Sequence, residues 1–149
     1  MSDFRLLGFR YSPGYGDMLG GSHSVSLRRE KDGAWTVTVS DREIHSSPTV
    51  VKKYAASEED VRRLGEFISK NRIASLEKRP KDDMFVTDYS PWSVSLDYEK
   101  TSFGRVSRKY CGFYEYQKYS PRDGRLIKVL LGIFDSLRGE PISETVEED

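Results

Sequence analysis

Apolar and polar residues alternate in several stretches of the chain, which is the pattern of strands that bury one face. The clearest example is a hairpin around Asp32-Gly33, a dipeptide that favours tight turns between strands. The apolar positions on its two arms are Val25, Leu27, Trp35, Val37 and Val39. The same alternation predicts further strands at residues 3–11, 50–54, 85–89, 92–98 and 105–116.

Two other stretches have the period of amphipathic helices. The longer one, residues 120–139, begins with Ser120 as a capping residue and Pro121 at the first helical position. Its apolar positions form a stripe so wide that little of the helix should be exposed. Residues 57–70 begin with Ser57 as a capping residue, followed by three acidic side chains that suit the positive end of a helix dipole.

The order of these elements is several strands, a helix, more strands and a final helix. This order predicts an α+β fold with a single antiparallel sheet of about five to seven strands and two helices packed on one face. We expect residues 1–140 to form a single domain, because a chain of 149 residues has the size of one domain. Residues 141–149 are rich in acidic side chains and are expected to form a frayed C-terminal tail.

Composition narrows the function classes only a little. The 24 basic and 24 acidic residues balance, so the chain has no overall attraction to nucleic acid or to anionic membranes. No apolar stretch reaches the length of a membrane span. A single cysteine excludes an internal disulfide. The chain as given is consistent with a cytoplasmic protein, and an extracytoplasmic location stays open if a leader was removed.

Residue types used in catalysis are few and scattered. His23 and His45 are the only histidines, and a metal site would need both of them together with carboxylates or Cys111. No serine lies in a G-x-S-x-G motif, and the glycine-rich residues 14–21 precede a strand and lack a P-loop lysine. The carboxylates Asp82, Asp83, Asp88 and Asp97 have no spacing that fixes a catalytic pair. We therefore expect no catalytic residues, no metal site and no cofactor.

The most informative feature is a set of aromatic residues in the second half of the chain. In residues 110–116 the tyrosines fall on one parity of the predicted strand, and Cys111 and Phe113 fall on the other. Because two helices cover only one face, some tyrosines should be exposed together with nearby basic side chains. The candidate binding residues are Tyr15, Asp17, Arg108, Tyr110, Tyr114 and Tyr116. The alternative is that the aromatic residues pack across strands and only stabilise the sheet.

The layout resembles that of small bacterial α+β domains of unknown function. The residues that carry the resemblance are Gly20-Gly21-Ser22, Asp32-Gly33, the helix start Ser57-Glu58-Glu59-Asp60, and Trp92 to Tyr98. A looser likeness is to emfourin-type protease-inhibitor domains, which have a similarly compact plan. Neither resemblance supplies catalytic residues.

These observations favour a non-catalytic binding or interaction domain that uses an exposed Tyr/Arg sheet face and the glycine-rich loop. A protein or a glycan is the expected partner, and nucleic acid is disfavoured. Two alternatives stay open. One is a small enzyme with its site near the Gly14–Ser22 loop and His23 as its acid–base group, and the other is a protease-inhibitor-like domain with that loop as a wedge. The sequence leaves the oligomeric state open.

Overall fold

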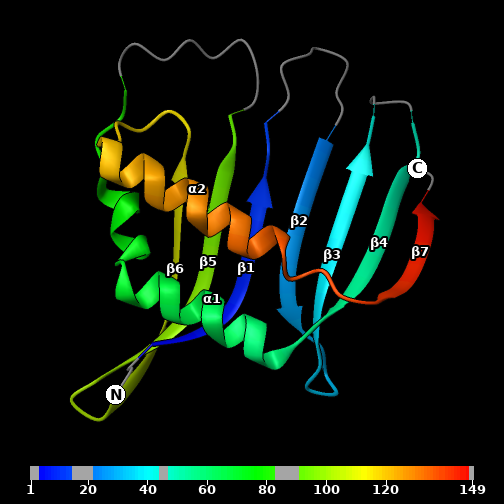
Figure 1. Cartoon of the computed structure of the whole chain (residues 1–149), viewed down its shortest axis with the longest axis horizontal. Helices are drawn as coiled ribbons and strands as arrows, with labels where there is room; N and C mark the ends of the chain where they lie inside the picture. Colours follow the sequence, from blue (N-terminus) through cyan, green and yellow to red (C-terminus); the bar gives the residue numbers. More distant parts are fainter. Residues whose placement is uncertain (1–3, 15–21, 44–46, 83–90, 148–149) are drawn as a thin grey trace.

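Seven strands form one antiparallel sheet in the order β6-β5-β1-β2-β3-β4-β7 (Figure 1). The computed structural model describes residues 4–14, 22–43, 47–82 and 91–147. The strands are β1 (Phe4–Ser12), β2 (Ser22–Arg29), β3 (Trp35–Arg42), β4 (Thr49–Ala56), β5 (Ser93–Ser102), β6 (Arg105–Tyr114) and β7 (Pro141–Glu147). The helices are α1 (Glu58–Lys70), the short 3-10 helix η1 (Ile73–Lys78) and α2 (Pro121–Asp135). The predicted α+β fold with a single antiparallel sheet is confirmed.

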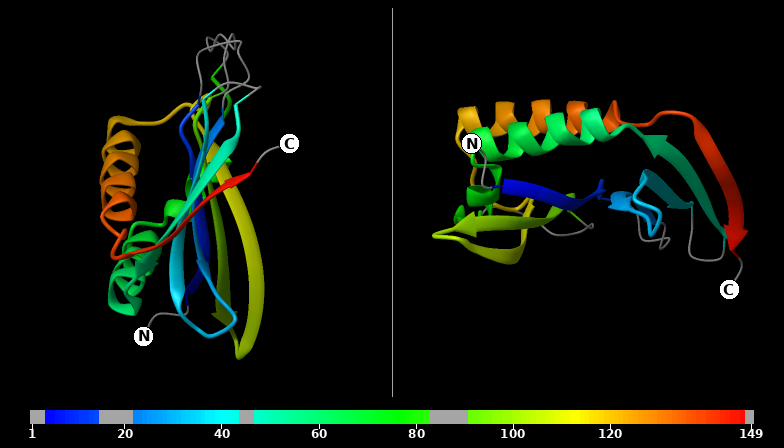
Figure 2. Two further views of the ribbon diagram at one scale, coloured as in Figure 1. Left: turned by 90° about the vertical axis from the view of Figure 1, so that its right-hand side faces the viewer. Right: turned by 90° about the horizontal axis from the view of Figure 1, so that it is seen from below.

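Both long helices lie on the same side of the sheet, as the edge-on view in Figure 2 shows. Ser57 caps α1 by accepting a hydrogen bond from the Asp60 N–H. Ser120 and Asp123 cap α2 reciprocally, each side chain accepting from the other residue's backbone N–H. The helix starts predicted from the sequence are therefore confirmed, and the caps fix where each helix begins against the sheet.

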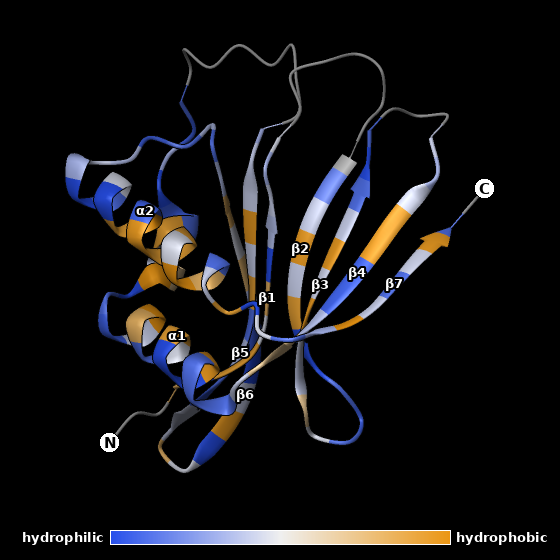
Figure 3. Cartoon of the chain, turned by 45° about the vertical axis from the view of Figure 1, so that its right-hand side comes forward, coloured by the Kyte–Doolittle hydropathy of each residue, from blue (hydrophilic) through white to orange (hydrophobic). Residues whose placement is uncertain are grey.

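The core lies between the helices and one face of the sheet. Figure 3 shows apolar and polar residues alternating along strands such as β2 and β3, which gives them one apolar face. Phe9 of β1 packs on Phe134 of α2 with ring centroids 4.3 Å apart. Phe113 of β6 and Leu130 of α2 are completely buried in the same cluster. The helices therefore occupy one face of the sheet and leave the other one to solvent.

Strand boundaries differ from the predicted ones in the second half of the chain. β5 runs ten residues, from Ser93 to Ser102, and turns into β6 through Phe103 and Gly104, which both have positive φ. The strands predicted at residues 92–98 and 105–116 leave residues 99–104 as their connection, but Glu99–Ser102 continue β5 and only residues 103–104 form the turn. β6 ends at Tyr114, so Tyr116 follows the strand instead of belonging to it. The strand predicted at residues 85–89 lies outside the described residues.

The prediction of a frayed tail is wrong for most of its length. Residues 141–147 form β7, which pairs with β4 at the edge of the sheet. The connection from α2 is fixed where the Gly139 N–H donates to the Ala55 carbonyl oxygen at 2.8 Å and the Ala55 N–H donates to Glu140. A Cβ at Gly139 would lie 2.7 Å from that carbonyl oxygen, so this crossing requires glycine. Acidic composition suggested disorder, but pairing with β4 orders the segment.

The helices that the structure describes include none that is long and apolar enough to cross a membrane.

Candidate functional site

The face of the sheet that carries no helices, which we call the open face, consists mostly of small and polar side chains. Residues of this face alternate with core residues along each strand, as Ser95 and Asp97 do with the buried Val94 and Leu96 of β5. The strand register sets these residues in rows across four strands. One row is Gly112, Ser95, Arg10 and Ser26, and the next row is Tyr110, Asp97, Gly8 and Arg28.

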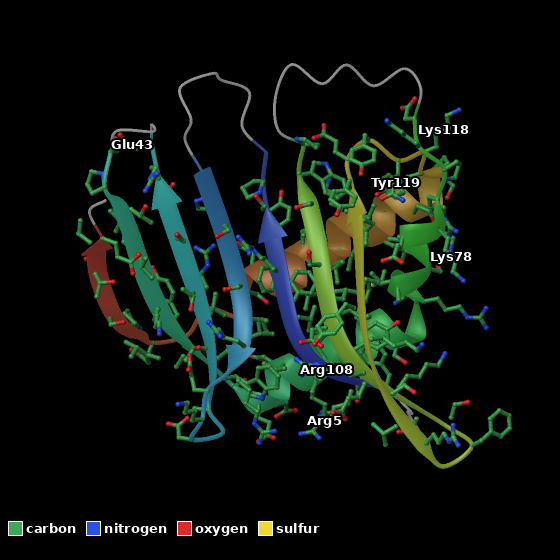
Figure 4. All side chains as sticks on the ribbon, turned by 180° about the vertical axis from the view of Figure 1, so that it is seen from behind. Arg5, Glu43, Lys78, Arg108, Lys118 and Tyr119 are labelled. Atoms are coloured by element: carbon green, nitrogen blue, oxygen red, sulfur yellow. The ribbon has the colours of Figure 1, made fainter. Side chains whose placement is uncertain are left out.

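A hollow of about 800 Å³ lies over these rows (Figure 4 looks toward this face). Its lining includes Arg10, Ser26, Arg28, Ser95, Tyr110 and Tyr114. Gly8 and Gly112 contribute no side chains to the floor of the hollow, whereas the tyrosines of β6 stand at one side of it. The hollow therefore has a low, hydroxyl-rich floor and an aromatic rim.

Arg108 of β6 is held in one position at this rim. Its guanidinium donates two hydrogen bonds to the Asp97 carboxylate, at 3.0 Å and 2.7 Å. The same guanidinium lies over the ring of Tyr110, 5.1 Å from its centroid. The hydrogen-bonded Asp97 carboxylate raises the pKa of Arg108, so the charge is permanent. Asp97 offsets that charge, and the paired guanidinium packs over the Tyr110 ring.

Arg10 and Arg28 carry the positive charge that a ligand would meet. Arg10 pairs with Ser26 and Gly8 pairs with Arg28, so the two arginines are diagonal neighbours on adjacent strands. Both side chains are exposed, and neither forms an ion pair with a described residue. Two guanidinium groups that pair with none of the described carboxylates thus face the hollow beside the aromatic rim.

Three tyrosines, Tyr114, Tyr116 and Tyr119, form a group at the C-terminal end of β6. Tyr114 and Tyr116 are parallel, with ring centroids 5.1 Å apart and planes at 9°. The Tyr119 hydroxyl donates to the Tyr114 carbonyl oxygen, and its ring stacks on Trp92 at 6.1 Å. Burial raises the pKa of Tyr119. The sequence left open whether the tyrosines are exposed for binding or pack together. In this group both hold, because Tyr114 stacks on Tyr116 and is also exposed.

Four of the six predicted binding residues lie together. Arg108, Tyr110 and Tyr114 line the hollow, and Tyr116 stacks on Tyr114 beside it. Tyr110 is 68% exposed and Tyr114 is 39% exposed. The other two predicted residues, Tyr15 and Asp17, lie outside the described residues.

Sequence reasoning missed Arg10 and Arg28. The alternation of apolar and polar residues along β1 and β2 shows which face Arg10 and Arg28 lie on. It does not show that β1 lies between β5 and β2 in the sheet. That pairing joins residues far apart in the sequence. Only the sheet order brings these arginines next to the tyrosines of β6.

Of the titratable residues considered for catalysis, His23, Cys111 and Asp97 lie in described strands. His23 Nδ1 lies 3.3 Å from Asp41 Oδ1 on the helix side of the sheet. Cys111 is half-buried. Burial, and to a smaller extent the negative charge of the nearby Glu77, raises the pKa of its thiol to about 11. Of the four candidate carboxylates, Asp97 binds Arg108, while Asp83 and Asp88 lie outside the described residues. Among the residues with described positions, no cluster of His, Cys, Asp and Glu could hold a metal ion.

Comparisons with known proteins add nothing to this site. No protein-family model matches the chain, no curated protein is similar to it, and no solved structure matches its fold. The resemblances suggested by the layout of the sequence therefore stay predictions.

Proposed function

We propose that the protein is a non-catalytic binding domain whose open face binds an acidic oligosaccharide. The observation that carries this proposal is the hollow in which Arg10 and Arg28, neither paired with a described carboxylate, lie beside the rim formed by Tyr110 and Tyr114. A planar guanidinium is suited to bind a carboxylate or sulfate group through two parallel hydrogen bonds. The proposal thus assigns the charged groups of the ligand to the two arginines.

The remaining side chains of the hollow suit a sugar better than a protein surface. Tyr110 presents an exposed ring, and rings of this kind pack on apolar faces while their hydroxyls stay hydrated. Ser26 and Ser95 offer hydroxyl groups that can donate and accept hydrogen bonds on the floor. The cores of protein interfaces are more apolar than this floor. A polar ligand with several hydroxyl groups and a negative charge matches all three kinds of side chain.

The glycine-rich loop remains part of the proposal as an expectation, because residues 15–21 lie outside the described residues. The alternatives of a small enzyme and of a protease inhibitor both depend on that loop. No observation on the described residues favours either of them over binding at the open face.

The proposal is tested by titration calorimetry with a tetrasaccharide of galacturonic acid. The double variant Arg10→Ser/Arg28→Ser should weaken binding at least about tenfold, because charged hydrogen bonds are lost. Arg62→Ser/Arg63→Ser on α1 removes the same charge from the helix side and should leave binding unchanged. A neutral cellotetraose should bind weakly to every variant.

Two results would overturn the proposal. One is a wild-type protein that does not bind the uronate, and the other is a double variant that binds it as the wild type does. If oligoglutamate binds at this face while the uronate does not, the face is correct and the ligand class is wrong.

A further inference from the structure

The sheet is open at both ends, and its two edges differ in charge. β6 forms one edge and β7 the other, each paired with a neighbour on one side only (Figure 1). An edge strand presents backbone N–H and C=O groups that can pair with a further strand. Natural proteins usually blunt such edges, so the way in which each edge is closed or left open is informative.

At the C-terminal end of β6, side chains of the same chain bind the outward-facing backbone N–H groups. The Gly112 N–H donates to the Glu77 carboxylate at 2.7 Å, and the Tyr114 N–H donates to the Gln117 side-chain oxygen at 2.7 Å. In an antiparallel sheet every second residue turns its N–H outward, so Tyr110, Arg108 and Val106 share this outward direction. No described side chain bonds to their N–H groups. We call this open segment, Arg105–Tyr110, the basic edge.

β7 is open along its whole length. All residues from Pro141 to Glu147 are exposed, and among the strands that the structure describes β7 pairs only with β4. Glu144 and Glu147 lie on the strand, and Glu140 directly precedes it. We call Pro141–Glu147 the acidic edge.

The charged side chains on the two edges determine which edges of two copies can pair. Two basic edges would bring the positive side chains of Arg105 and Lys109 together, and two acidic edges would do the same with Glu144 and Glu147. Like charges opposite each other destabilise strand pairs, whereas opposite charges stabilise them. Apolar side chains are also exposed on both edges: Val106 at 63%, Ile142 at 55% and Val146 at 58%. The basic edge of one copy is therefore opposite in net charge to the acidic edge of another.

We propose that the chain associates head to tail with further copies of itself, with β6 of one copy pairing with β7 of the next. The contact joins two different surfaces, so each bound copy still offers one edge of each kind, and the sheet continues from copy to copy. Arg105 and Lys109 have the parity of the buried Phe113, so they lie on the helix side of β6 and away from the hollow. The charged side chains that select this contact therefore point away from the hollow, although Arg108 and Tyr110 belong to both surfaces.

Sedimentation velocity on the whole chain tests the proposal. The wild type should sediment as a 17.1 kDa monomer when dilute and as larger species on concentration toward about 1 mM, as weak contacts do. Association should weaken in 1 M salt, where charges are screened beyond about 3 Å. A wild type that stays monomeric at every concentration would overturn the proposal.

Charge reversal identifies the edges. Arg105→Glu/Lys109→Glu makes both edges acidic, and Glu144→Lys/Glu147→Lys makes both basic, so each variant alone should be monomeric. An equimolar mixture of the two should associate again, because each edge then finds an opposite partner. The second variant breaks the exposed Lys52–Glu144 ion pair, which at 3.6 Å is worth little, so its melting temperature should stay close to that of the wild type.

Lys70→Glu/Lys128→Glu on the helices is the matched control for net charge, and it should associate as the wild type does. Edge variants that associate alone, or a mixture that remains monomeric, would show that the contact lies elsewhere.

Discussion

The same strands make both faces of the sheet, but one face is buried under the helices and the other is exposed. On β5, Val94 and Leu96 are buried beneath the helices, while Ser95 and Asp97 between them face the hollow of the open face. Burial of the first pair contributes to stability in proportion to the apolar area removed from water. The second pair contributes little in this way. Stability therefore constrains one parity of each strand and leaves the other available for recognition.

Phe113 and Tyr114 allow the sharpest comparison, because these neighbours on β6 point to opposite faces. Phe113 is fully buried, so Phe113→Ala should lower the free energy of unfolding by about 3–5 kcal/mol. Tyr114→Ala removes the stacking of a ring that is 39% exposed and should cost about 1 kcal/mol or less. Urea unfolding of the variants measures both values. Equal losses would contradict the division between the faces.

A smaller effect on stability is expected from Asp123, which lies in the first turn of α2. Asp123 is buried, and its hydrogen bonds with Arg79, above all, and with Ser120 hold the pKa of its carboxyl below the ordinary 3.8. A lowered folded-state pKa means that this stabilisation is present above about pH 4 and is lost as the pH falls through the folded pKa. Asp123→Asn should thus cost about 1 kcal/mol at pH 7, the typical value of a helix cap.

The gap in stability between Asp123→Asn and the wild type should narrow below pH 4, as thermal unfolding at several pH values would show. A gap that stays constant down to pH 2 would mean that charge plays no part in this contact.

The sequence predicted the elements that depend on neighbouring residues and missed those that depend on residues far away in the chain. Ser120 and Pro121 act on their own helix, and the predicted start of α2 was correct. The alternation in β2 and β3 is also local, and their hairpin was predicted. β7 depends on a partner strand that lies far away in the sequence, so its composition alone misleadingly indicated a frayed tail.

The candidate site shows the same limit. The parity of Tyr110 and Tyr114 could be derived from one strand, and both are exposed as expected. Arg10 and Arg28 join them only because β5 pairs with β1, which no local pattern indicates. The sequence therefore predicted Arg108, Tyr110 and Tyr114 of this candidate site and missed Arg10 and Arg28.

Nuclear magnetic resonance mapping of ligand contacts is the most direct test of the account, since a chain of 17.1 kDa gives resolved amide spectra. The spectra would be recorded during titration with the galacturonate tetrasaccharide. We predict that the shifted amides cluster at Arg10, Arg28 and Tyr110, while those of α1 and α2 stay in place. Shifts that are centred on the helices, or a spectrum that the uronate leaves unchanged, would contradict the assignment of recognition to the open face.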